Sequence, residues 1–327
     1  MNWSGRKVLV TGAGGFIGSH LAELLVEQGA NVRAMVHYNG AGRRGWLDSS
    51  RHADQMEFVA GDVADQESVW QAVSGCDTVF HLAALIAIPY SYVAPRSYVR
   101  TNVEGTLNVM EACRRLDVAR VVHTSTSEVY GTAQRVPIDE EHPLQGQSPY
   151  SASKIGADKV AESYHLSFGL PVVTVRPFNT YGPRQSARAV IPTIITQCLA
   201  GQTVKLGNLD PTRDLNFVAD TASGFLAAAS SENTAGQTYN LGTGREISIG
   251  DLARLIGELA GSPVDVVTDN QRVRPEGSEV ERLLASTAKT TRDLGWSSQV
   301  SLEEGLARTI DWIRAHQDHY RPGVYAV

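Results

Sequence analysis

Short apolar runs alternate with amphipathic stretches through the first half of the chain. The apolar runs predict strands at Lys7–Thr11, Asn31–Val36, Met56–Ala60, Thr78–Leu82, Arg120–Ser125 and Val172–Arg176. The intervening stretches predict helices at Phe16–Gln28, Ser68–Val73, Val99–Leu116 and Ser151–Phe168. This alternation is typical of a parallel sheet with helices on both faces, and the near-continuous Val, Leu and Ile content suits strands buried on both sides. The sequence therefore predicts an α/β protein with a doubly wound parallel sheet.

A glycine-rich loop joins the first predicted strand to the first predicted helix. Gly12, Gly15 and Gly18 fit the spacing G-x-x-G-x-x-G. In such a loop the first glycine permits a tight turn, the second lets backbone N–H groups approach a pyrophosphate, and the third lets the helix pack close to the sheet. A glycine-rich turn can exist without a ligand, but this position favours a Rossmann-type dinucleotide site. We expect cofactor contacts from Gly12, Gly15, Phe16, Ile17 and Gly18.

The residues that would select between NAD and NADP are ambiguous. The second strand is followed by His37, where NAD-binding folds carry an acidic residue for the adenosine ribose. Arg33, Arg43 and Arg44 lie nearby and would either meet a 2′-phosphate or belong to a solvated loop. Asp62, after the third strand, would either accept from the adenine amino group or cap a turn. These residues leave both cofactors open.

After Pro177 the regular alternation ends. Turn signals such as Gly182-Pro183 and Asp210-Pro211 become frequent. The remaining predicted helices are Ile191–Ala200, Ala219–Ser230, Ile249–Gly261 and Leu302–Ala315. We therefore predict a dinucleotide-binding domain at residues 1–177, to which some later segments return, and a smaller α/β substrate-binding cap formed mainly by residues 178–327.

Candidate catalytic side chains cluster in the sequence near the fifth strand and the helix after it. Tyr150 and Lys154 are four residues apart, so they share a helix face, and an ammonium beside a phenol stabilises the phenolate as a base. Thr126, Ser127 and Glu128 follow the fifth strand, at the sheet edge where open α/β sheets bind ligands. Alcohol oxidation needs no carboxylate, whereas taking a proton next to a ketone and expelling a hydroxyl needs a second acid/base. Glu128 suits that task, unless it is only a helix-start or surface residue.

Composition excludes several other classes of function. A net charge of −6 argues against a general nucleic-acid surface. Cys76, Cys113 and Cys198 are far apart and lack a C-x-x-C spacing, so we expect neither a disulfide framework nor a metal site. Met1–Lys7 is polar, and the apolar run Leu82–Pro89 is about half a membrane span. We expect a cytoplasmic protein with no membrane or nucleic-acid partner.

Several motifs together resemble those of the extended short-chain dehydrogenase/reductase family, over nearly the whole chain. They are Thr11–Gly18, Gly61-Asp62-Val63, His81-Leu82-Ala83-Ala84, Thr101–Thr106, Tyr150 with Lys154, Arg176–Pro183, and Arg213-Asp214 with Val218-Ala219-Asp220. With the resemblance, the expected cofactor contacts outside the glycine loop are His37, Asp62, Val63, Leu82, Ala83, Ala84, Tyr150 and Lys154.

Within that family, Thr126-Ser127-Glu128 resembles the active-site triplet of nucleotide-sugar 4,6-dehydratases, in the form found in GDP-mannose enzymes. The runs Leu85–Tyr92 and Ser186–Pro192 are instead similar to dehydratases of the legionaminic acid pathway. Those enzymes retain the configuration at C5 and act on UDP- or GDP-linked N-acetylglucosamine. The resemblance implies NAD as cofactor, leaving NADP open, and implies catalytic roles for Thr126, Glu128, Tyr150 and Lys154.

The resemblance also implies how a nucleotide sugar would bind. Arg213 and Arg274 would clamp the pyrophosphate, a task that suits bidentate guanidinium groups, or else form surface ion pairs. Asn179 would touch the sugar phosphate, and Val204-Lys205-Leu206 would line the base. We expect substrate contacts from Ser127, Asn179, Val190, Lys205, Arg213 and Arg274.

Three functions fit these residues. A 4,6-dehydratase uses the tyrosine–lysine pair and gives Glu128 a task. A 4-epimerase needs only that pair and a hydroxyl partner such as Thr126. A non-catalytic nucleotide sensor would keep all of these residues unused, so the sequence favours the dehydratase. The resemblance further implies a homodimer formed through helices 99–116 and 151–168.

Overall fold

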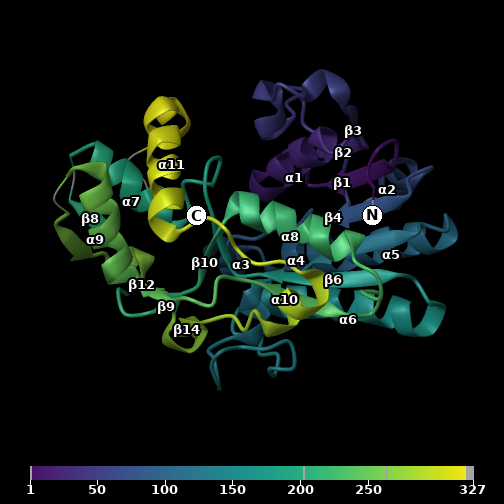
Figure 1. Ribbon diagram of the computed structural model, residues 1–327. Coiled ribbons are helices and arrows are strands. Elements are labelled where there is room, and N and C mark those ends of the chain that lie inside the picture. The colour runs from purple at the N-terminus through teal and green to yellow at the C-terminus, as the bar shows by residue number, and fades with distance from the viewer. Residues whose placement is uncertain (1, 202, 263, 322–327) are drawn as a thin grey trace.

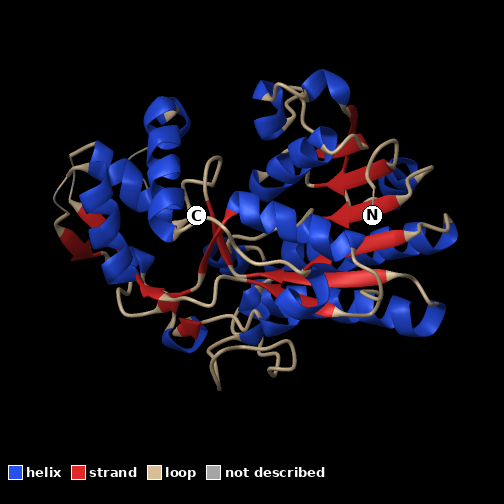
Figure 2. Ribbon diagram, viewed as in Figure 1, coloured by secondary structure: helices blue, strands red, loops and turns tan. Residues whose placement is uncertain are grey.

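A seven-stranded parallel sheet forms the centre of the molecule in the computed structural model, which describes residues 2–201, 203–262 and 264–321. The strand order is β11-β6-β5-β4-β1-β2-β3, and each neighbouring pair is parallel. The strands are β1 (Lys7–Thr11), β2 (Asn31–His37), β3 (Glu57–Gly61), β4 (Thr78–His81), β5 (Arg120–Thr124), β6 (Val172–Pro177) and β11 (Thr238–Leu241). Helices lie on both faces (Figures 1 and 2), which confirms the predicted fold class.

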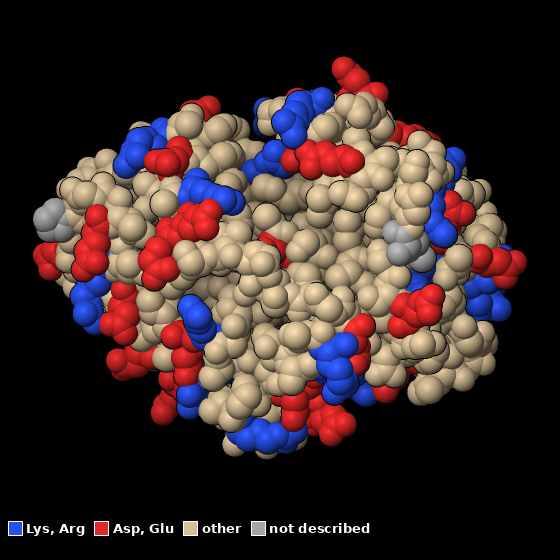
Figure 3. Space-filling model, in the orientation of Figure 1, with Lys and Arg blue, Asp and Glu red and all other residues tan. Residues whose placement is uncertain are grey.

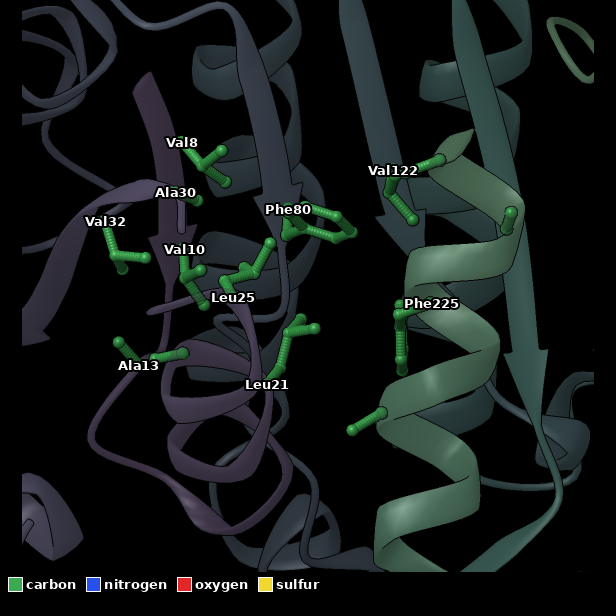
Figure 4. Packing of buried hydrophobic residues seen from close by; sticks show 14 of the residues in the cluster. Val8, Val10, Ala13, Leu21, Leu25, Ala30, Val32, Phe80, Val122 and Phe225 are labelled. Atoms are coloured by element: carbon green, nitrogen blue, oxygen red, sulfur yellow. The ribbon is translucent and has the colours of Figure 1, made fainter. Parts of the chain in front are cut away.

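Two apolar cores hold these helices to the sheet. One face is covered by α1 (Phe16–Glu27) and α8 (Val218–Ser230), and the other by α2 (Gln66–Val73), α5 (Gly105–Arg115) and α6 (Pro149–Phe168). Figure 4 shows Leu21 and Leu25 of α1 and Phe225 of α8 in the first core, beside the strand residues Val10 and Phe80. Full burial of each such side chain stabilises the fold by about 1.5–3 kcal/mol.

Local sequence signals set the ends of α6, the helix that carries Tyr150. Ser148 caps it by accepting from the Ser151 N–H at 3.1 Å, and Pro149 occupies its first turn. Gly169 ends it in the left-handed region at φ 70°.

The predicted helix Val99–Leu116 is confirmed, but its first part is not α-helical. Residues Val99–Glu104 form a wider π-helical segment, η3, and α5 begins only at Gly105. Inside that segment Asn102 turns inward, where its amide accepts from the Leu85 N–H at 2.8 Å and donates to the Leu85 carbonyl at 3.0 Å. π-Helical turns of this kind are frequent at functional sites.

The sequence did not predict the small strands of the later part or the short helices at Ile88–Val93, Pro95–Tyr98 and Ala288–Leu294. Its predicted helices Ile191–Ala200, Ile249–Gly261 and Leu302–Ala315 are confirmed within one residue at each end. The strand pairs are β7 (Asn179–Tyr181) with β10 (Leu215–Phe217), β8 (Val204–Leu206) with β13 (Val266–Thr268), and β9 (Thr212–Arg213) with β12 (Ile247–Ser248) and β14 (Arg282–Leu283). The remaining α-helices are α3 (Ile88–Val93), α4 (Pro95–Tyr98), α7 (Val190–Leu199), α9 (Ile249–Ala260), α10 (Ala288–Leu294) and α11 (Leu302–Ala315). Short 3₁₀ turns are η1 (Gly45–Ser49), η2 (Ala53–Gln55), η4 (Ser127–Tyr130), η5 (Asn270–Arg272), η6 (Glu276–Ser278) and η7 (Gln317–His319).

The later part has a core of its own. Apolar side chains of α7, α9 and α11, such as Ile194, Leu252 and Leu306, pack together away from the main sheet. These helices form the left part of Figure 1, whereas α8 and β11 return to the sheet. On the face drawn in Figure 3, acidic and basic side chains are interspersed and no broad basic area is visible. Among the described helices, none is both long and apolar enough to cross a membrane.

Candidate active site

The glycine loop forms a tight turn against the end of β4. Gly12 has φ 68°, and a Cβ there would lie 2.9 Å from the Ala83 nitrogen, so only glycine fits. The Gly15 N–H donates to the Gly12 carbonyl at 3.0 Å, so this N–H is used within the turn. Helix α1 then begins at Phe16, and no described side chain caps it. The open N–H groups at this helix end fit a pyrophosphate.

A directional chain of hydrogen bonds links this loop to α5. The Thr11 hydroxyl accepts from the Leu82 and Ala83 N–H groups, both at 3.1 Å, so its one hydrogen points to His81 Nδ1 at 2.9 Å. His81 must therefore donate from Nε2 to the Thr106 hydroxyl at 3.0 Å. Burial lowers the pKa of His81 well below its usual value, which agrees with this neutral form. The expected contacts at residues 82–84 are thus held beside the loop.

At the adenosine end, only part of the expected set is available to a cofactor. His37 is exposed at the end of β2, and Asp62 accepts from the Ala64 N–H at 2.9 Å, so it caps a turn. Arg33 cannot bind a 2′-phosphate. Its guanidinium is buried and donates to the Ala72 and Ser74 carbonyls, both at 2.8 Å.

The loop between β2 and β3 keeps two arginines exposed. Arg43 and Arg44 both lie at the surface. The Arg44 guanidinium stacks on the Phe58 ring, 4.2 Å from its centroid. Val63, the last expected cofactor contact near the adenosine end, is buried. Its side chain packs so close to Gly105 that a Cβ there would lie 2.9 Å from Val63 Cγ2.

Three of the four expected catalytic side chains meet at the ends of β5 and α6. Tyr150 is 7% exposed and shares a hydrogen bond with Thr126. Burial raises the pKa of Tyr150, the Thr126 hydrogen bond lowers it, and the nearby charge of Glu128 raises it further. Glu128 is itself 9% exposed, and Tyr98 packs edge-on against the phenol with ring centroids 6.2 Å apart. The structure therefore places a phenol, a hydroxyl and a carboxylate in one water-poor pocket.

Lys154 is buried on the same helix but is directed elsewhere. Its Nζ donates to the Thr124 carbonyl at 2.6 Å, and none of the described hydrogen bonds joins it to Tyr150. Burial lowers the pKa of Lys154 to about 8, while the charge of Asp158 raises it. The sequence predicted that Tyr150 and Lys154 share a helix face. It did not predict that the Lys154 ammonium lies near the Thr124 carbonyl and the Asp158 carboxylate.

A second group of polar side chains comes from the later part of the chain. Arg213, on β9, and Arg274 approach the same carboxylate oxygen of Glu279, each at 3.5 Å. Burial lowers the pKa of Arg213, and the charge of Glu128 raises it, so this group lies within electrostatic reach of the catalytic pocket. The Oδ1 atom of Asn179 is buried without a hydrogen-bond partner in the described part of the chain.

Arg274 is incompletely satisfied, whereas Arg213 also donates from Nη1 to the Thr212 carbonyl at 2.9 Å. A separation of 3.5 Å is an ion-pair distance but too long for a good hydrogen bond, and Arg274 Nη1 is buried with no hydrogen-bond partner among the described residues. Unpaired donors on a cation and an unpaired acceptor are expensive to bury. The unpaired donor of Arg274 suits an anionic ligand such as a diphosphate, whereas the unpaired Oδ1 acceptor of Asn179 suits a donor such as a sugar hydroxyl.

The remaining expected substrate contacts are only partly brought to this group. Ser127 is buried at the start of η4, beside Glu128, and Val190 is half-buried at the start of α7. The prediction that Val204-Lys205-Leu206 lines a base needs correction. Val204 and Leu206 are buried in the core of the later part, and only Lys205 points outward. Alternation along a strand puts neighbours on opposite faces.

Sequence reasoning missed two acidic residues of this region. Asp158 lies four residues after Lys154, so the helix period that selected Lys154 would also have found it. Glu279 has no such local signal, because it meets Arg213 only through the fold. Among the described residues, no group of His, Cys, Asp and Glu has the geometry of a metal site.

Comparisons with known proteins identify the family. The sequence profile of the GDP-mannose 4,6-dehydratase family matches residues 9–309, which is most of the chain. The chain belongs to this family. Similar family members include a dTDP-glucose 4,6-dehydratase of Actinoplanes sp., 34% identical over 95% of this chain and 98% of that protein. A UDP-glucose 4-epimerase of Mycolicibacterium smegmatis is also 34% identical, over 94% and 98%.

Solved structures of the GDP-mannose 4,6-dehydratase family and its relatives share the fold. DesIV of Streptomyces venezuelae, a dTDP-glucose 4,6-dehydratase with NAD bound, has a TM-score of 0.88 and 32% identity, over 96% of this chain and 99% of that one. A UDP-glucuronic acid 4-epimerase of Bacillus cereus with UDP-glucuronic acid and NAD has a TM-score of 0.86 and 28% identity, over 95% and 99%. Both hold NAD, which confirms the predicted cofactor for this fold. Both reactions occur among the relatives, so family membership alone does not separate them.

Proposed function

We propose that this chain is an NAD-dependent nucleotide-sugar 4,6-dehydratase that acts on UDP- or GDP-linked N-acetylglucosamine. The observation that carries the proposal is the burial of Glu128 beside Tyr150. A carboxylate is costly to bury unless it has a partner or a task. A 4-epimerase would leave Glu128 without one, whereas a dehydratase needs a second acid/base at this place.

The first half of the reaction belongs to Tyr150. As phenolate it takes the proton of the C4 hydroxyl, and the Thr126 hydrogen bond helps to stabilise that phenolate. NAD, held at the Gly12–Gly18 loop, would supply a hydride acceptor for C4 and the hydride that returns to C6. The Lys154 ammonium adds positive charge to the same pocket while it holds the Thr124 carbonyl.

The second half belongs to Glu128. The new C4 ketone acidifies the C5 proton, which the carboxylate removes. Glu128 then gives this proton to the departing C6 hydroxyl, because the Ser127 hydroxyl is a poor acid. The C6 carbon accepts the returning hydride, C5 takes a proton from solvent through Glu128, and Tyr150 releases the C4 hydroxyl proton to solvent, so the net change is the loss of one water and the cofactor is unchanged.

Substrate binding would use the second group of side chains. Arg213 and Arg274 would exchange the long contacts to Glu279 for short charge-assisted bonds to the diphosphate. Asn179 would contact the substrate where the sugar joins the phosphate, and Lys205 would lie beside the nucleotide base. The diphosphate assignment is supported by the unsatisfied Nη1 donor of Arg274, and the unsatisfied Oδ1 acceptor of Asn179 would take a hydrogen bond from a sugar hydroxyl.

The proposal includes a homodimer formed through residues 99–116 and 151–168. Apolar side chains on these helices are exposed in the single chain, as expected for an interface. They are Val99, Leu107, Leu166 and Phe168. We also place the protein in the cytoplasm, because its three cysteines are free thiols.

Mass spectrometry of the products tests the reaction. The purified protein is incubated with UDP-N-acetylglucosamine, GDP-N-acetylglucosamine, GDP-mannose and dTDP-glucose, with protein-free mixtures as controls. We expect a product lighter by one water from an N-acetylglucosamine nucleotide. An unchanged mass with a new sugar pattern by NMR would show a 4-epimerase instead, and loss of water only from another sugar would contradict the proposed substrate.

A further inference from the structure

Asp158 is a buried carboxylate at the centre of a hydrogen-bond network behind the catalytic residues. It lies one turn after Lys154 on α6 and is 4% exposed. Its Oδ1 accepts from His123 Nε2 at 3.0 Å. Its Oδ2 accepts from the Ser125 hydroxyl at 2.8 Å and from Arg176 Nε and Nη2 at 3.2 and 3.0 Å. These contacts join α6 to β5 and β6 at the edge of the sheet where the reaction is placed.

The network holds both ends of the segment that carries the catalytic triplet. At one end Ser125, which directly precedes Thr126, donates to Asp158. At the other end Arg176 Nη1 donates to the Tyr130 hydroxyl at 3.0 Å, and Tyr130 is two residues after Glu128. The guanidinium also lies 5.0 Å from the centroid of the Tyr130 ring. The Asp158–Arg176 pair therefore fixes residues 125 and 130, and with them the path of the chain between.

The Tyr130 end is itself anchored to the sheet. Its hydroxyl donates to Asn240 Oδ1 on β11 at 2.8 Å, and Asn240 donates to the Ile138 carbonyl at 3.1 Å. A phenol that both accepts and donates has used its one hydrogen. A shift of η4 would therefore break bonds on two strands at once, which keeps Glu128 in place.

Charge links the same carboxylate to Lys154. The titratable groups that interact with this ammonium from the packed elements are Asp158 on α6, His81 on β4 and His123 on β5. Arg176 on β6 is paired with Asp158. His81 and His123 are neutral, because burial lowers the pKa of both. Asp158 stays charged, since His123 and Arg176 hold its pKa at about 2. Asp158 is thus the anion that faces Lys154.

We propose that Asp158 is a positioning residue: its carboxylate is the counter-charge that keeps Lys154 an ammonium ion, and through Ser125 and Arg176 it fixes the segment that carries Thr126 and Glu128. The role in turnover rests on the proposed function. The role toward Lys154 does not, and it is tested without any substrate.

The small number of lysines makes the charge of Lys154 directly measurable. The sequence contains five, at Lys7, Lys154, Lys159, Lys205 and Lys289. Protein made with lysine labelled with ¹³C at Cε would give five titrating NMR signals, and Lys154→Arg assigns the one of interest. In the wild type we expect Lys154 to titrate near the pKa of about 8 that its burial produces. In Asp158→Asn we expect that pKa to fall by about one unit or more.

Glu162→Gln is the matched control, with the same change of carboxylate to amide four residues further along α6. Glu162 is exposed and pairs with Lys159 at 2.6 Å. It should shift only the Lys159 signal, and slightly, because exposed pairs are screened by solvent. An unchanged Lys154 titration in Asp158→Asn would overturn the proposal, as would an equal shift in Glu162→Gln.

Asp158→Asn leaves Arg176 as a buried cation without its partner, which destabilises a fold strongly. If that variant does not fold, the double variant Asp158→Asn with Arg176→Met removes both charges together. A smaller fall in the Lys154 pKa is expected, because the loss of the Asp158 charge lowers that pKa and the loss of the more distant Arg176 charge offsets only part of the change. A double variant with the wild-type titration would likewise contradict the proposal.

Turnover separates the positioning of Glu128 from the charge on Lys154. Tyr130→Phe removes the hydroxyl that joins Arg176 to η4 and leaves every charge in place. We expect it to slow water loss about tenfold with C4 oxidation little changed, whereas Asp158→Asn slows both and moves the alkaline limb of kcat to lower pH. Water loss at the wild-type rate in Tyr130→Phe would remove the positioning role. A wild type inactive on every nucleotide sugar would contradict the proposed function, and the NMR titration would still decide the role of Asp158.

Discussion

The two sides of the candidate site are built differently. On the reaction side, Thr126 caps and Glu128 lies in the short turn η4 that follows strand β5 of the seven-stranded sheet, and Tyr150 and Lys154 lie on a helix of 20 residues. The binding side, Asn179, Lys205, Arg213 and Arg274, stands on strands of two or three residues and on a loop.

The contacts differ in the same way. Around the reaction side, hydrogen bonds of 2.6–3.2 Å tie Lys154 and Asp158 to the sheet. On the binding side, Arg213 and Arg274 keep ion-pair distances of 3.5 Å to Glu279. Rigid elements hold reacting groups in place, and loosely paired cations are free to turn to an anionic ligand. The comparison teaches that substitutions on the first side should change turnover, and those on the second should change affinity.

Tyr150→Phe is the strongest test of the reaction side. Loss of the phenol should lower kcat by about 10²–10⁴-fold, because a positioned general base is removed, while KM stays nearly unchanged. Steady-state rates of product formation measure both constants. Near-normal turnover in this variant would mean that Tyr150 is not the base, and the reaction side would lose its central residue.

Glu128→Gln should allow the first half of the reaction, C4 oxidation, and slow the second half, the loss of water. The amide keeps the shape of the side chain but cannot take a proton, so C4 oxidation proceeds and water loss slows by about 10²-fold. The expected signs are NADH absorbance that rises on addition of substrate, little 4-keto-6-deoxy product, and no solvent deuterium at C5. Water loss at the wild-type rate would show that another group is the acid/base, and the case against an epimerase would end.

Arg274→Ala tests the binding side. Removal of one arm of the proposed diphosphate clamp should raise KM by about 10- to 100-fold and leave kcat within a few-fold, as expected for a charge-assisted bond made equally in the ground and transition states. Arg282→Ala is the control, since this exposed arginine pairs with Glu246 and has no proposed contact with substrate. A fall in kcat with an unchanged KM would contradict the division of labour between the two sides.

Low pH should destabilise the contact between α1 and the segment Pro183-Arg184. This is the smallest of the four expected effects. His20 on α1 donates to the Pro183 carbonyl at 3.1 Å and lies beside Arg184. Burial, and then the Arg184 charge, lowers the pKa of His20 from 6.5 to about 4.

The pKa of His20 is lower in the folded protein than in the unfolded chain. The stability that neutral His20 contributes is therefore fully present above pH 6.5 and is lost as the pH falls toward about 4. At about pH 5 the loss should reach roughly 2 kcal/mol. Urea unfolding of the wild type and of His20→Gln at about pH 8 and pH 5 measures it. Equal acid sensitivity of the two proteins would exclude His20 as the cause.

Much of the reaction side follows from local sequence. Strand β1 runs from Lys7 to Thr11 as predicted, and α6 carries Tyr150 and Lys154 between a serine cap and a terminal glycine. Apolar periodicity, capping residues and glycine spacing act over a few residues, so the sequence states them directly. The glycine loop and the tyrosine–lysine spacing are therefore evident from the order of the amino acids alone.

Other features exist only because the fold brings distant segments together. Strand β11, Thr238–Leu241, pairs with β6, which lies much earlier in the sequence. The four residues of β11 are too few to show a pattern from which a strand can be predicted. Arg33 looks like a phosphate ligand in sequence, yet tertiary packing buries it against backbone carbonyls. The amino-acid sequence by itself determined the Rossmann sheet and its glycine loop and pointed to the side chains proposed to react, because those signals are local. Only the tertiary structure decided that Glu279 joins Arg213 to Arg274 and that Asp158 faces Lys154, because the charge around a buried group depends on which segments surround it.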